Sequence, residues 1–341
     1  MTALFVHAAH DLRLGKSETG PPGPGEVRIK LARGGICGSD LHYYLHGGFG
    51  TVRLREPMIL GHEVSGHVAA LGEGVTGLEV GDLVAVSPSR PCRTCDECHR
   101  GLPHQCLNMR FYGSAMPFPH IQGAFRETLI ADASQCVPAH GLSPAMAAMA
   151  EPLAVVLHAV RRAGSLVGKR VLVTGCGPIG VLTILAARRA GADEVIATDV
   201  AERMLGYARD AGADHALNAA APEALSPWSA GKGQIDVAFE CSGAEPALRA
   251  AIAVLRPQGT LVQLGMSGDM SVPLMQVTAK ELKVQGSFRF HEEFATAVSL
   301  MQKGLLDVAP LLSHSYPLAE FAEAFDMATD RSQAMKVQLE F

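Results

Sequence analysis

The feature that most constrains the fold is a run of four cysteines, Cys92, Cys95, Cys98 and Cys106, within fifteen positions. Four thiolates at roughly 2.3 Å form the tetrahedral shell of a structural zinc, and Cys-x-x-Cys turns bring such ligands together. Disulfides are the alternative, but the chain is long, lacks a secretion signal and keeps four other cysteines scattered. We therefore expect a closed structural zinc in a lobe at about residues 90–107, where it does no chemistry.

Size and composition predict a globular protein of two domains. The chain has 341 residues, of which 18% are charged and 48% hydrophobic. A net charge of −5 provides no basic face for nucleic acid. No apolar stretch reaches the ~20 residues that a membrane span needs. We expect a cytoplasmic protein with reduced thiols and with neither nucleic acid nor membrane as a partner.

The chain changes character near residue 150. Before it, short β-like segments such as 26–31 and 83–86 are separated by Gly- and Pro-rich turns. After it, strands and helices alternate, which predicts crossover connections and a parallel sheet. The expected strands are 170–174, 194–199, 235–239, 260–264 and 282–284, and the expected helices between the first of them are 179–190 and 202–211. A tail from about Ser287 carries a helix at 292–302 and a final strand at 334–339.

A glycine motif lies between the first of these strands and its helix, and its residues are Gly175, Gly177, Pro178, Ile179 and Gly180. Such glycines let the backbone turn and approach a pyrophosphate, whose charge the helix N-terminus stabilises. Asp199 ends the next strand. Its carboxylate can accept hydrogen bonds from the ribose hydroxyls and would repel a 2′-phosphate. NAD is therefore favoured over NADP, although Arg203 could accommodate the phosphate.

A second group of metal ligands is scattered along the chain. Cys37 follows the first strands, His62 and Glu63 are adjacent, and Glu151 precedes the nucleotide-binding region. Spacing alone cannot join them, because a single His or Cys is more often a core residue than a ligand.

Several motifs resemble the zinc-dependent medium-chain alcohol and polyol dehydrogenases. They are Gly61-His62-Glu63, the four-cysteine run and Gly175-x-Gly-x-x-Gly180, and the match continues nearly end to end. Glu151 in Glu-Pro-Leu and Gly286-Ser-Phe-Arg289 are similar to the sorbitol dehydrogenase branch. Segments 33–44, 109–120, 150–155 and 333–339 resemble bacterial members of that family that act on a sugar acid.

The resemblance implies an α/β plus β fold: a GroES-like catalytic domain interrupted by a Rossmann NAD-binding domain. The GroES-like domain would span 1–150 and the Rossmann domain 151–286, with a tail, 287–341, that returns to the first domain. The activity implied is hydride transfer between NAD and a secondary alcohol, with two Zn²⁺ ions per subunit. The resemblance also implies a homo-oligomer, either a dimer or a homotetramer.

The site residues follow from the same resemblance. Cys37 and His62 would bind the catalytic zinc, and the third protein ligand is either Glu63 or Glu151. An open position on that zinc binds the substrate hydroxyl and lowers its pKa. Ser39 and His42 have the spacing of the family's proton relay. Tyr43 would line the substrate cleft.

The substrate is expected to be a sugar acid, whose carboxylate suits an arginine fork. The two candidates are Arg110 and Arg289. Neutral polyols such as sorbitol or xylitol, and L-threonine, are the alternative substrates. A non-catalytic alternative is a four-cysteine zinc module joined to a nucleotide sensor, which is disfavoured because Cys37, His62 and the relay residues are all present.

Overall fold

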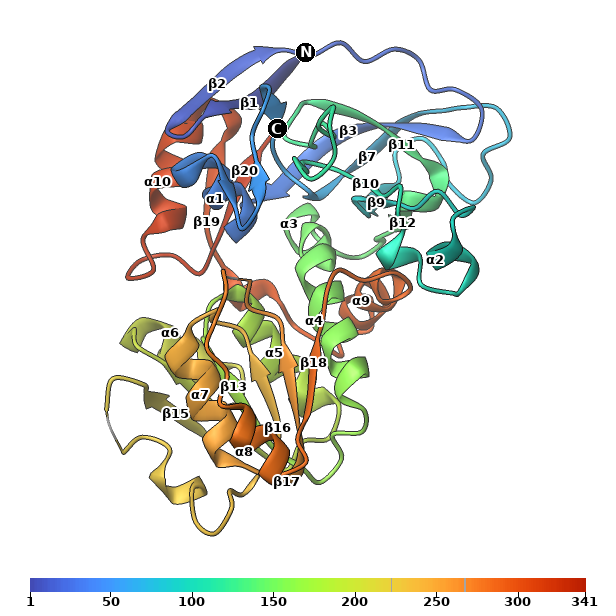
Figure 1. The fold of residues 1–341 in the computed structure, drawn as a ribbon. Helices are drawn as coiled ribbons and strands as arrows, with labels where there is room; N and C mark the ends of the chain where they lie inside the picture. Colours follow the sequence, from blue (N-terminus) through green and yellow to red (C-terminus); the bar gives the residue numbers. More distant parts are fainter. Residues whose placement is uncertain (222, 267) are drawn as a thin grey trace. The chain divides into compact units, whose positions relative to one another are not determined.

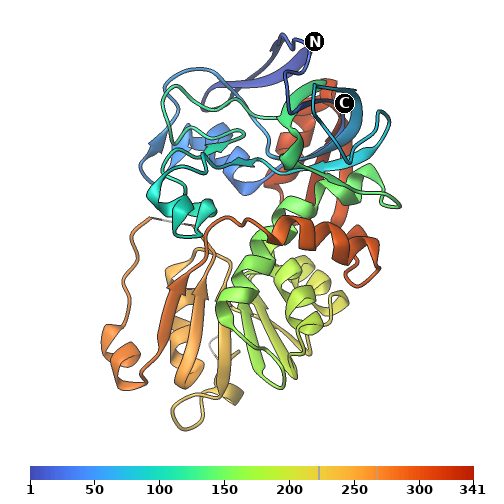
Figure 2. The ribbon, with the colours of Figure 1, turned by 90° about the vertical axis from the view of Figure 1, so that its right-hand side faces the viewer.

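The computed structural model describes residues 1–221, 223–266 and 268–341, and the chain divides into two compact units (Figures 1 and 2). Unit 1 comprises Met1–Glu151, His291–Asp330 and Lys336–Phe341, and unit 2 comprises Pro152–Phe290 and Arg331–Met335. These limits lie within a few residues of the predicted domains. The assignment of Arg331–Met335 to unit 2 was not anticipated.

Unit 1 is built on a sheet in which β12, β8, β7, β3, β20 and β19 follow one another, while β11 also pairs with β3. The central strand β3 (Glu26–Gly35) pairs antiparallel with β7 (Glu63–Leu71). Along β3, Val27, Ile29 and Leu31 are buried whereas Lys30 is exposed, which is the alternation expected of a strand with one face in the core. The remaining strands of this sheet are β8 (Leu83–Val86), β11 (Thr128–Asp132), β12 (Cys136–Pro138), β19 (Leu312–Pro317) and β20 (Lys336–Glu340).

The C-terminal tail completes that sheet, because β20 pairs with both β3 and β19. The predicted helix of the tail is present as α9 (Glu293–Gln302), whereas α10 (Phe321–Thr329) and β19 were missed. The other elements of unit 1 are β1 (Thr2–Ala8), β2 (Asp11–Lys16), α1 (Gly38–His46), β4 (Gly48–Phe49), β5 (Val52–Arg53), β6 (Met58–Ile59), β9 (Ser89–Arg90), α2 (Asp96–His99), β10 (Arg110–Phe111) and α3 (Pro144–Ala148).

Unit 2 contains a six-stranded parallel sheet in the order β15-β14-β13-β16-β17-β18, with helices on both faces (Figure 2). Numbered from β13, this order is 3-2-1-4-5-6, the doubly wound arrangement of dinucleotide-binding folds, so the predicted Rossmann fold is confirmed. The elements are α4 (Ala150–Ala163), which begins at the end of unit 1, then β13 (Arg170–Thr174), α5 (Pro178–Arg189), β14 (Glu194–Asp199), α6 (Glu202–Asp210), β15 (His215–Asn218), β16 (Ile235–Glu240), α7 (Glu245–Val254), β17 (Leu255–Gln263), α8 (Leu274–Ala279) and β18 (Lys283–Gly286).

The strands β13 and β14 have the predicted limits, 170–174 and 194–199. Both are buried along almost their whole length, as a sheet covered on two faces requires. Helix α5 begins at Pro178, one residue before the prediction, because proline fits the first helical position, where no N–H donor is needed.

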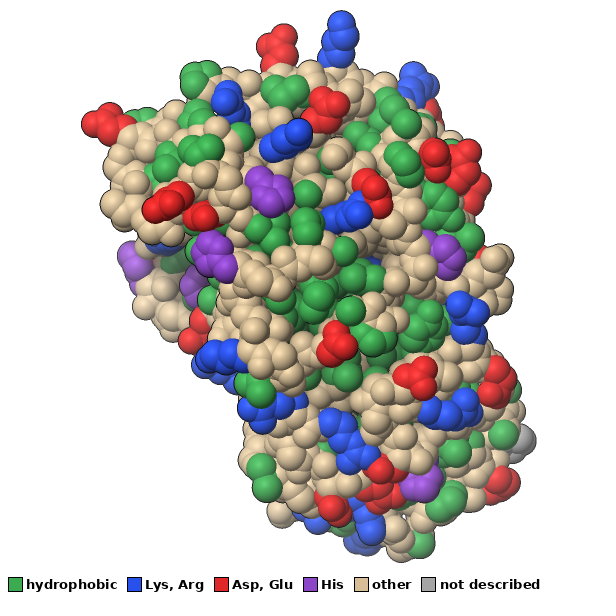
Figure 3. Space-filling model, turned by 180° about the vertical axis from the view of Figure 1, so that it is seen from behind, with side chains coloured by type: hydrophobic (Ala, Val, Ile, Leu, Met, Phe, Trp, Pro, Cys, Tyr) green, Lys and Arg blue, Asp and Glu red, His purple; other side chains and the backbone are tan. Residues whose placement is uncertain are grey.

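The surface carries charges of both signs. Acidic and basic side chains are interspersed over the face in Figure 3. In the part of the chain that the structure describes, no helix has both the length and the apolar character needed to cross a membrane.

Candidate metal and cofactor sites

Three predicted ligands meet in unit 1. The ligand atoms of Cys37, His62 and Glu63 all lie within 4.8 Å of one another. Strand pairing explains this, because Cys37 follows the end of β3 and Glu63 begins β7, where it is the register partner of Gly35. A Cβ atom on Gly35 would lie 2.2 Å from Glu63 Oε2, so a residue without a side chain is needed for this carboxylate to fit.

Asp40 holds two of these ligands in place, a role that the sequence did not indicate. The side chain is fully buried. One of its oxygens accepts from Cys37 N at 3.0 Å, and the other accepts from Gly61 N at 3.2 Å. The latter oxygen lies 3.8 Å from His62 Nδ1, so the carboxylate fixes the backbone on both sides of the group and faces the imidazole.

Lys336 is a second residue that sequence reasoning missed. It lies on β20 with 2% of its side chain exposed, forms an ion pair with Glu63 and donates to Ile36 O at 3.1 Å. Burial opposes its charge, but the attraction of Glu63 and Cys37 outweighs that effect and raises the pKa of the ammonium. Lysine is almost never buried unless it is paired, but the strand sequence Lys-Val-Gln-Leu-Glu gives no sign that Lys336 is buried.

Glu151 lies outside the compact group of three but interacts with it electrostatically. It belongs to the first turn of α4 and is 5% exposed. Burial raises the pKa of its carboxyl to about 8, and the neighbouring Glu63 and Cys37 add to the shift while His62 and Lys336 oppose it. Burial also raises the pKa of the Cys37 thiol to about 12. Among the described residues of this cluster, the acidic groups of Cys37, Glu63 and Glu151 outnumber the ammonium of Lys336, which is the electrostatic environment of a cation site.

The donor set also fits a zinc ion. It combines a thiol, an imidazole and carboxylates, which are the ligand types of catalytic zinc. Among the described residues His62 Nδ1 is buried and has no hydrogen-bond partner. Cys37, His62 and Glu63 could therefore hold the metal, with Glu151 next to it.

The predicted relay residues lie on α1. The backbone of Ser39 donates a hydrogen bond that favours the Cys37 thiolate, and His42 is exposed on the same helix. Partial desolvation of its ring and the nearby His46 lower the pKa of the His42 imidazole. Tyr43 is 2% exposed, and its hydroxyl accepts from Ala115 N at 3.0 Å, so within this unit it packs in the core.

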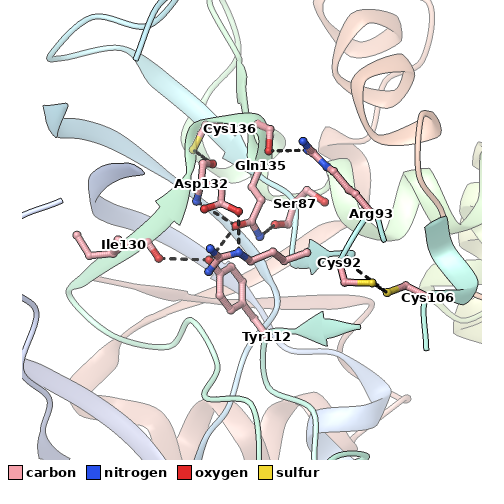
Figure 4. Close-up of polar contacts among 11 residues, drawn as sticks. Ser87, Cys92, Arg93, Cys106, Tyr112, Ile130, Asp132, Gln135 and Cys136 are labelled. Atoms are coloured by element: carbon pink, nitrogen blue, oxygen red, sulfur yellow. Dashed lines mark hydrogen bonds and ion pairs between the residues drawn. The ribbon is translucent and has the colours of Figure 1, made fainter. Parts of the chain in front are cut away.

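The four clustered cysteines also come together. All four sulfurs lie within 4.8 Å of one another, with 3.5 Å between Cys92 and Cys106 and 3.9 Å between Cys95 and Cys106. A tetrahedron of sulfurs at the zinc–thiolate distance has edges of about 3.8 Å, whereas a disulfide is about 2.05 Å long. The spacing therefore fits a shared metal ion, and Figure 4 shows Cys92 and Cys106 turned toward each other.

The surroundings of the thiols in this lobe shift their pKa values in opposite directions. Hydrogen bonds from Thr94 lower the pKa of Cys92 to about 5. Burial and contact with Cys95 and Cys106 raise the pKa of Cys98 to about 12. Four sulfurs this close cannot all ionise unless a cation lies among them, which is the condition that a zinc ion would satisfy.

The glycine motif of unit 2 forms a tight turn from β13 into α5. Gly175 has φ +83°, and a Cβ on it would lie 2.8 Å from Ser242. A Cβ on Gly180 would lie 1.8 Å from Gly175 O, so the third glycine lets the helix pack against the turn. Gly177 is the N-cap of α5 and faces open space, which leaves room for a pyrophosphate at the helix N-terminus.

Asp199 lies at the end of β14, beside that turn. Its carboxylate is nearly buried and accepts from Cys176 N at 2.6 Å and from Ala201 N at 2.9 Å. It lines a cavity of about 390 Å³ together with Gly175, Ser242 and Arg331. Arg203 is not among the lining residues, and its guanidinium lies 5.9 Å from the ring centroid of Tyr207. The basic residue that lines this cavity with Asp199 is therefore Arg331, which the sequence did not indicate.

The two arginines predicted to contact substrate lie in different units. Arg289 belongs to unit 2, has φ +59°, and its guanidinium lies 4.7 Å from the ring centroid of Phe288. Arg110 lies on β10 of unit 1 and lines a cavity to which Cys37, His62 and Glu63 do not contribute. The next residue, Phe111, has its ring 5.6 Å from that of His62. The structure thus brings Phe111, and not Arg110, to the candidate zinc site.

These features are shared with a known family. A family model for the alcohol dehydrogenase GroES-like domain matches residues 23–141, and one for the zinc-binding dehydrogenases matches residues 178–303. The chain belongs to the medium-chain, zinc-type alcohol and polyol dehydrogenases, which are NAD(P)-dependent oxidoreductases.

Individual relatives place the chain within that family. It is 44% identical over 319 residues to L-idonate 5-dehydrogenase (NAD(P)(+)) of Escherichia coli K12, covering 92% of this chain and 91% of the relative. It is 35% identical over 343 residues to sorbitol dehydrogenase of Gallus gallus, covering 99% and 95%. The crystal structure of L-idonate 5-dehydrogenase from E. coli K-12 superposes with a TM-score of 0.96 at 41% identity, covering 100% of this chain and 98% of that one.

Proposed function

We propose that this protein is an L-idonate 5-dehydrogenase, which interconverts L-idonate and 5-keto-D-gluconate with NAD. The observation that carries the proposal is 44% identity along 92% of the chain to an enzyme of that name. The convergence of Cys37, His62 and Glu63 supports the chemistry, because these residues are the donor set of a catalytic zinc. Sorbitol dehydrogenases are the next group of relatives, so a neutral polyol is the second candidate substrate.

We assign the two metal sites as follows. Cys37, His62 and Glu63 would hold the catalytic zinc. That ion would bind the alcohol at its open position and lower the pKa of the hydroxyl. Glu151 lies beside this group and contacts the substrate or a water molecule. Cys92, Cys95, Cys98 and Cys106 hold the structural zinc.

The residues of α1 would move the proton that an alcohol loses before it gives up hydride. Ser39 passes the proton on through its hydroxyl, and His42 exchanges it with solvent, since it is exposed and its pKa is below the ordinary value. Lys336 and Asp40 are positioning residues, because they hold Glu63 and the backbone around His62 rather than the substrate.

NAD is the proposed cofactor, although the name of the E. coli relative covers both NAD and NADP. Asp199 lies in the cavity beside the glycine turn, where a carboxylate hydrogen-bonds ribose hydroxyls and repels a 2′-phosphate. Arg331 in the same cavity weakens this discrimination, so we expect residual activity with NADP.

The test is a panel of initial rates with L-idonate, sorbitol, xylitol and L-threonine, each with NAD and with NADP. The proposal requires the highest kcat/KM with L-idonate and NAD. A higher value with sorbitol would assign the protein to the neutral-polyol dehydrogenases instead.

We further propose that the chain forms a homodimer or homotetramer and acts in the cytoplasm. Light scattering on the purified protein measures the first property, and a monomer at micromolar concentration would refute it. Fractionation of the producing cells measures the second.

A further inference from the structure

We propose that unit 1 contains a second ligand site, which binds a small oxyanion such as phosphate or a dicarboxylate. It is a cavity of about 330 Å³ whose lining includes Arg90, Arg110 and Arg126. A cavity of this size suits a small ligand. None of the candidate zinc ligands or cofactor residues lines it, so the site lies outside the proposed reaction centre.

The backbone of β10 separates this cavity from the candidate zinc site. Arg110 and Tyr112 line the cavity, whereas Phe111 between them does not and instead has its ring 5.6 Å from that of His62. Successive side chains of an extended segment point to opposite faces. The cavity and the zinc site therefore lie on opposite sides of this segment.

The charges of the cavity are only partly compensated. Arg90 and Arg110 are direct partners in the two-stranded sheet of β9 and β10, where like charges destabilise the pair. Arg90 is ion-paired to Asp132 at 2.6 Å. Among the residues that the structure describes, neither Arg110 nor Glu18, the carboxylate that lines the cavity, forms an ion pair. A bound anion would offset the repulsion between Arg90 and Arg110 that the ion pair with Asp132 does not cancel.

Arg126 adds a third guanidinium from another segment. Its Nε and Nη2 both donate to Gly123 O, at 2.9 and 2.6 Å. A guanidinium has five N–H donors, and the other three of Arg126 have no partner among the described residues. Burial also lowers the pKa of this group, which is a cost that a nearby anion would offset.

Two other polar side chains of the lining, His120 and Tyr112, are already occupied. The ring nitrogens of His120 bond to Arg55 N and Pro117 O, each at 2.9 Å. The hydroxyl of Tyr112 bonds to Ile130 O and Gln135 Oε1, as Figure 4 shows. The arginines and the side-chain nitrogen of Gln122 are thus the donors that remain for a ligand, and guanidinium forks match the paired oxygens of carboxylates and phosphates.

Two carboxylates set the charge that the ligand can carry. Asp132 neutralises Arg90, and Glu18 lines the same cavity. Three guanidinium groups against these two acids leave a site with one net positive charge. A mono- or dianion fits this balance, whereas a polyanion such as nucleic acid does not.

The experiment is isothermal titration of the zinc-loaded, full-length protein, without cofactor or substrate, using inorganic phosphate in one arm and succinate in the other. Chloride at matched ionic strength gives the baseline. We expect saturable binding of one anion per chain by at least one of the two, and the stronger of them identifies the ligand class.

Three variants test the assignment. Arg110→Gln should weaken binding at least about tenfold, because it removes a charge-assisted contact. Arg110→Lys, which keeps the charge but loses the fork, should give an intermediate value. Arg13→Gln is the matched control, since Arg13 carries the same charge, is exposed beside Asp11 and does not line the cavity.

The proposal is wrong if neither anion binds saturably, or if Arg110→Gln and Arg13→Gln bind as the unmodified protein does. Circular dichroism on Arg110→Gln confirms that it is folded, and Arg126→Gln serves in its place if it is not. If no anion binds and Arg110→Gln alters the mass of the oligomer, an acidic side chain of a second copy fills the cavity, which also refutes a small-ligand site.

Discussion

Replacing Lys336 with Met should destabilise the metal-free protein strongly. Lys336 and Glu63 form an ion pair in which each side chain is only 2% exposed. Removing one partner of a buried pair costs about 3–5 kcal/mol, because the other charge stays buried without compensation. At about 2–4 °C per kcal/mol for a unit of this size, the Tm should fall by roughly 6–20 °C.

Zinc should reverse part of this loss. If Glu63 is a metal ligand, the divalent cation next to it takes over the compensation that Lys336 provides. We therefore expect a clearly smaller fall in Tm for zinc-loaded Lys336→Met than for the chelated variant. The assay is differential scanning calorimetry of both proteins in both metal states.

The control is Arg13→Met, which removes the basic partner of the exposed pair with Asp11 and should shift Tm little. A fall of less than about 2 °C in chelated Lys336→Met would refute the claim that the ion pair matters. Equal falls with and without zinc would show that Glu63 is not next to the metal.

Three further substitutions have defined outcomes. Asp199→Ala should raise KM for NAD and narrow the gap to NADP, and unchanged KM values for both cofactors would remove Asp199 from the ribose site. Gly180→Ala should weaken NAD binding and lower Tm, because its Cβ would lie 1.8 Å from Gly175 O; a variant with normal Kd for NAD would contradict this. Arg289→Ala should lower kcat/KM for L-idonate at least about tenfold more than Arg110→Ala does, since a charge-assisted contact is worth about 1.5–3 kcal/mol. Equal losses in the two variants would show that Arg289 does not bind the substrate carboxylate.

The Rossmann unit could be predicted from the sequence because its signals are local. Strands β13 and β14 each contain three consecutive apolar residues, Val-Leu-Val and Val-Ile-Ala, and the glycine turn between β13 and α5 requires particular residues at fixed positions. The helices of this unit were placed to within one residue at α5 and α6. The missed helix α10 follows a strand in the tail, where no glycine turn or nucleotide motif marks the start of a helix.

The site could be predicted only in part, because its geometry depends on contacts between distant segments. The resemblance indicated Cys37, His62 and Glu63, and the pairing of β3 with β7 brings them together. Lys336 joins them from the far end of the chain, 300 residues from its acceptor Ile36 O. No local pattern predicts such a contact.

Neighbouring residues on one strand show the same limit. Sequence reasoning selected Arg110 for its charge and its motif, but in the structure Phe111 faces His62 and Arg110 lines the opposite cavity. A shift of one residue along a strand moves to the opposite face of the sheet. The sequence does not determine which face each side chain of a two-residue strand such as β10 occupies.

Zinc content under mild chelation tests the central claim most directly. We expect two zinc ions per chain in the active protein, of which a mild chelator removes one together with the activity while the circular dichroism spectrum is unchanged. Cys37→Ser should retain one zinc, remain folded and be inactive. Fully active protein with one zinc per chain, or activity that survives loss of the labile ion, would contradict the account.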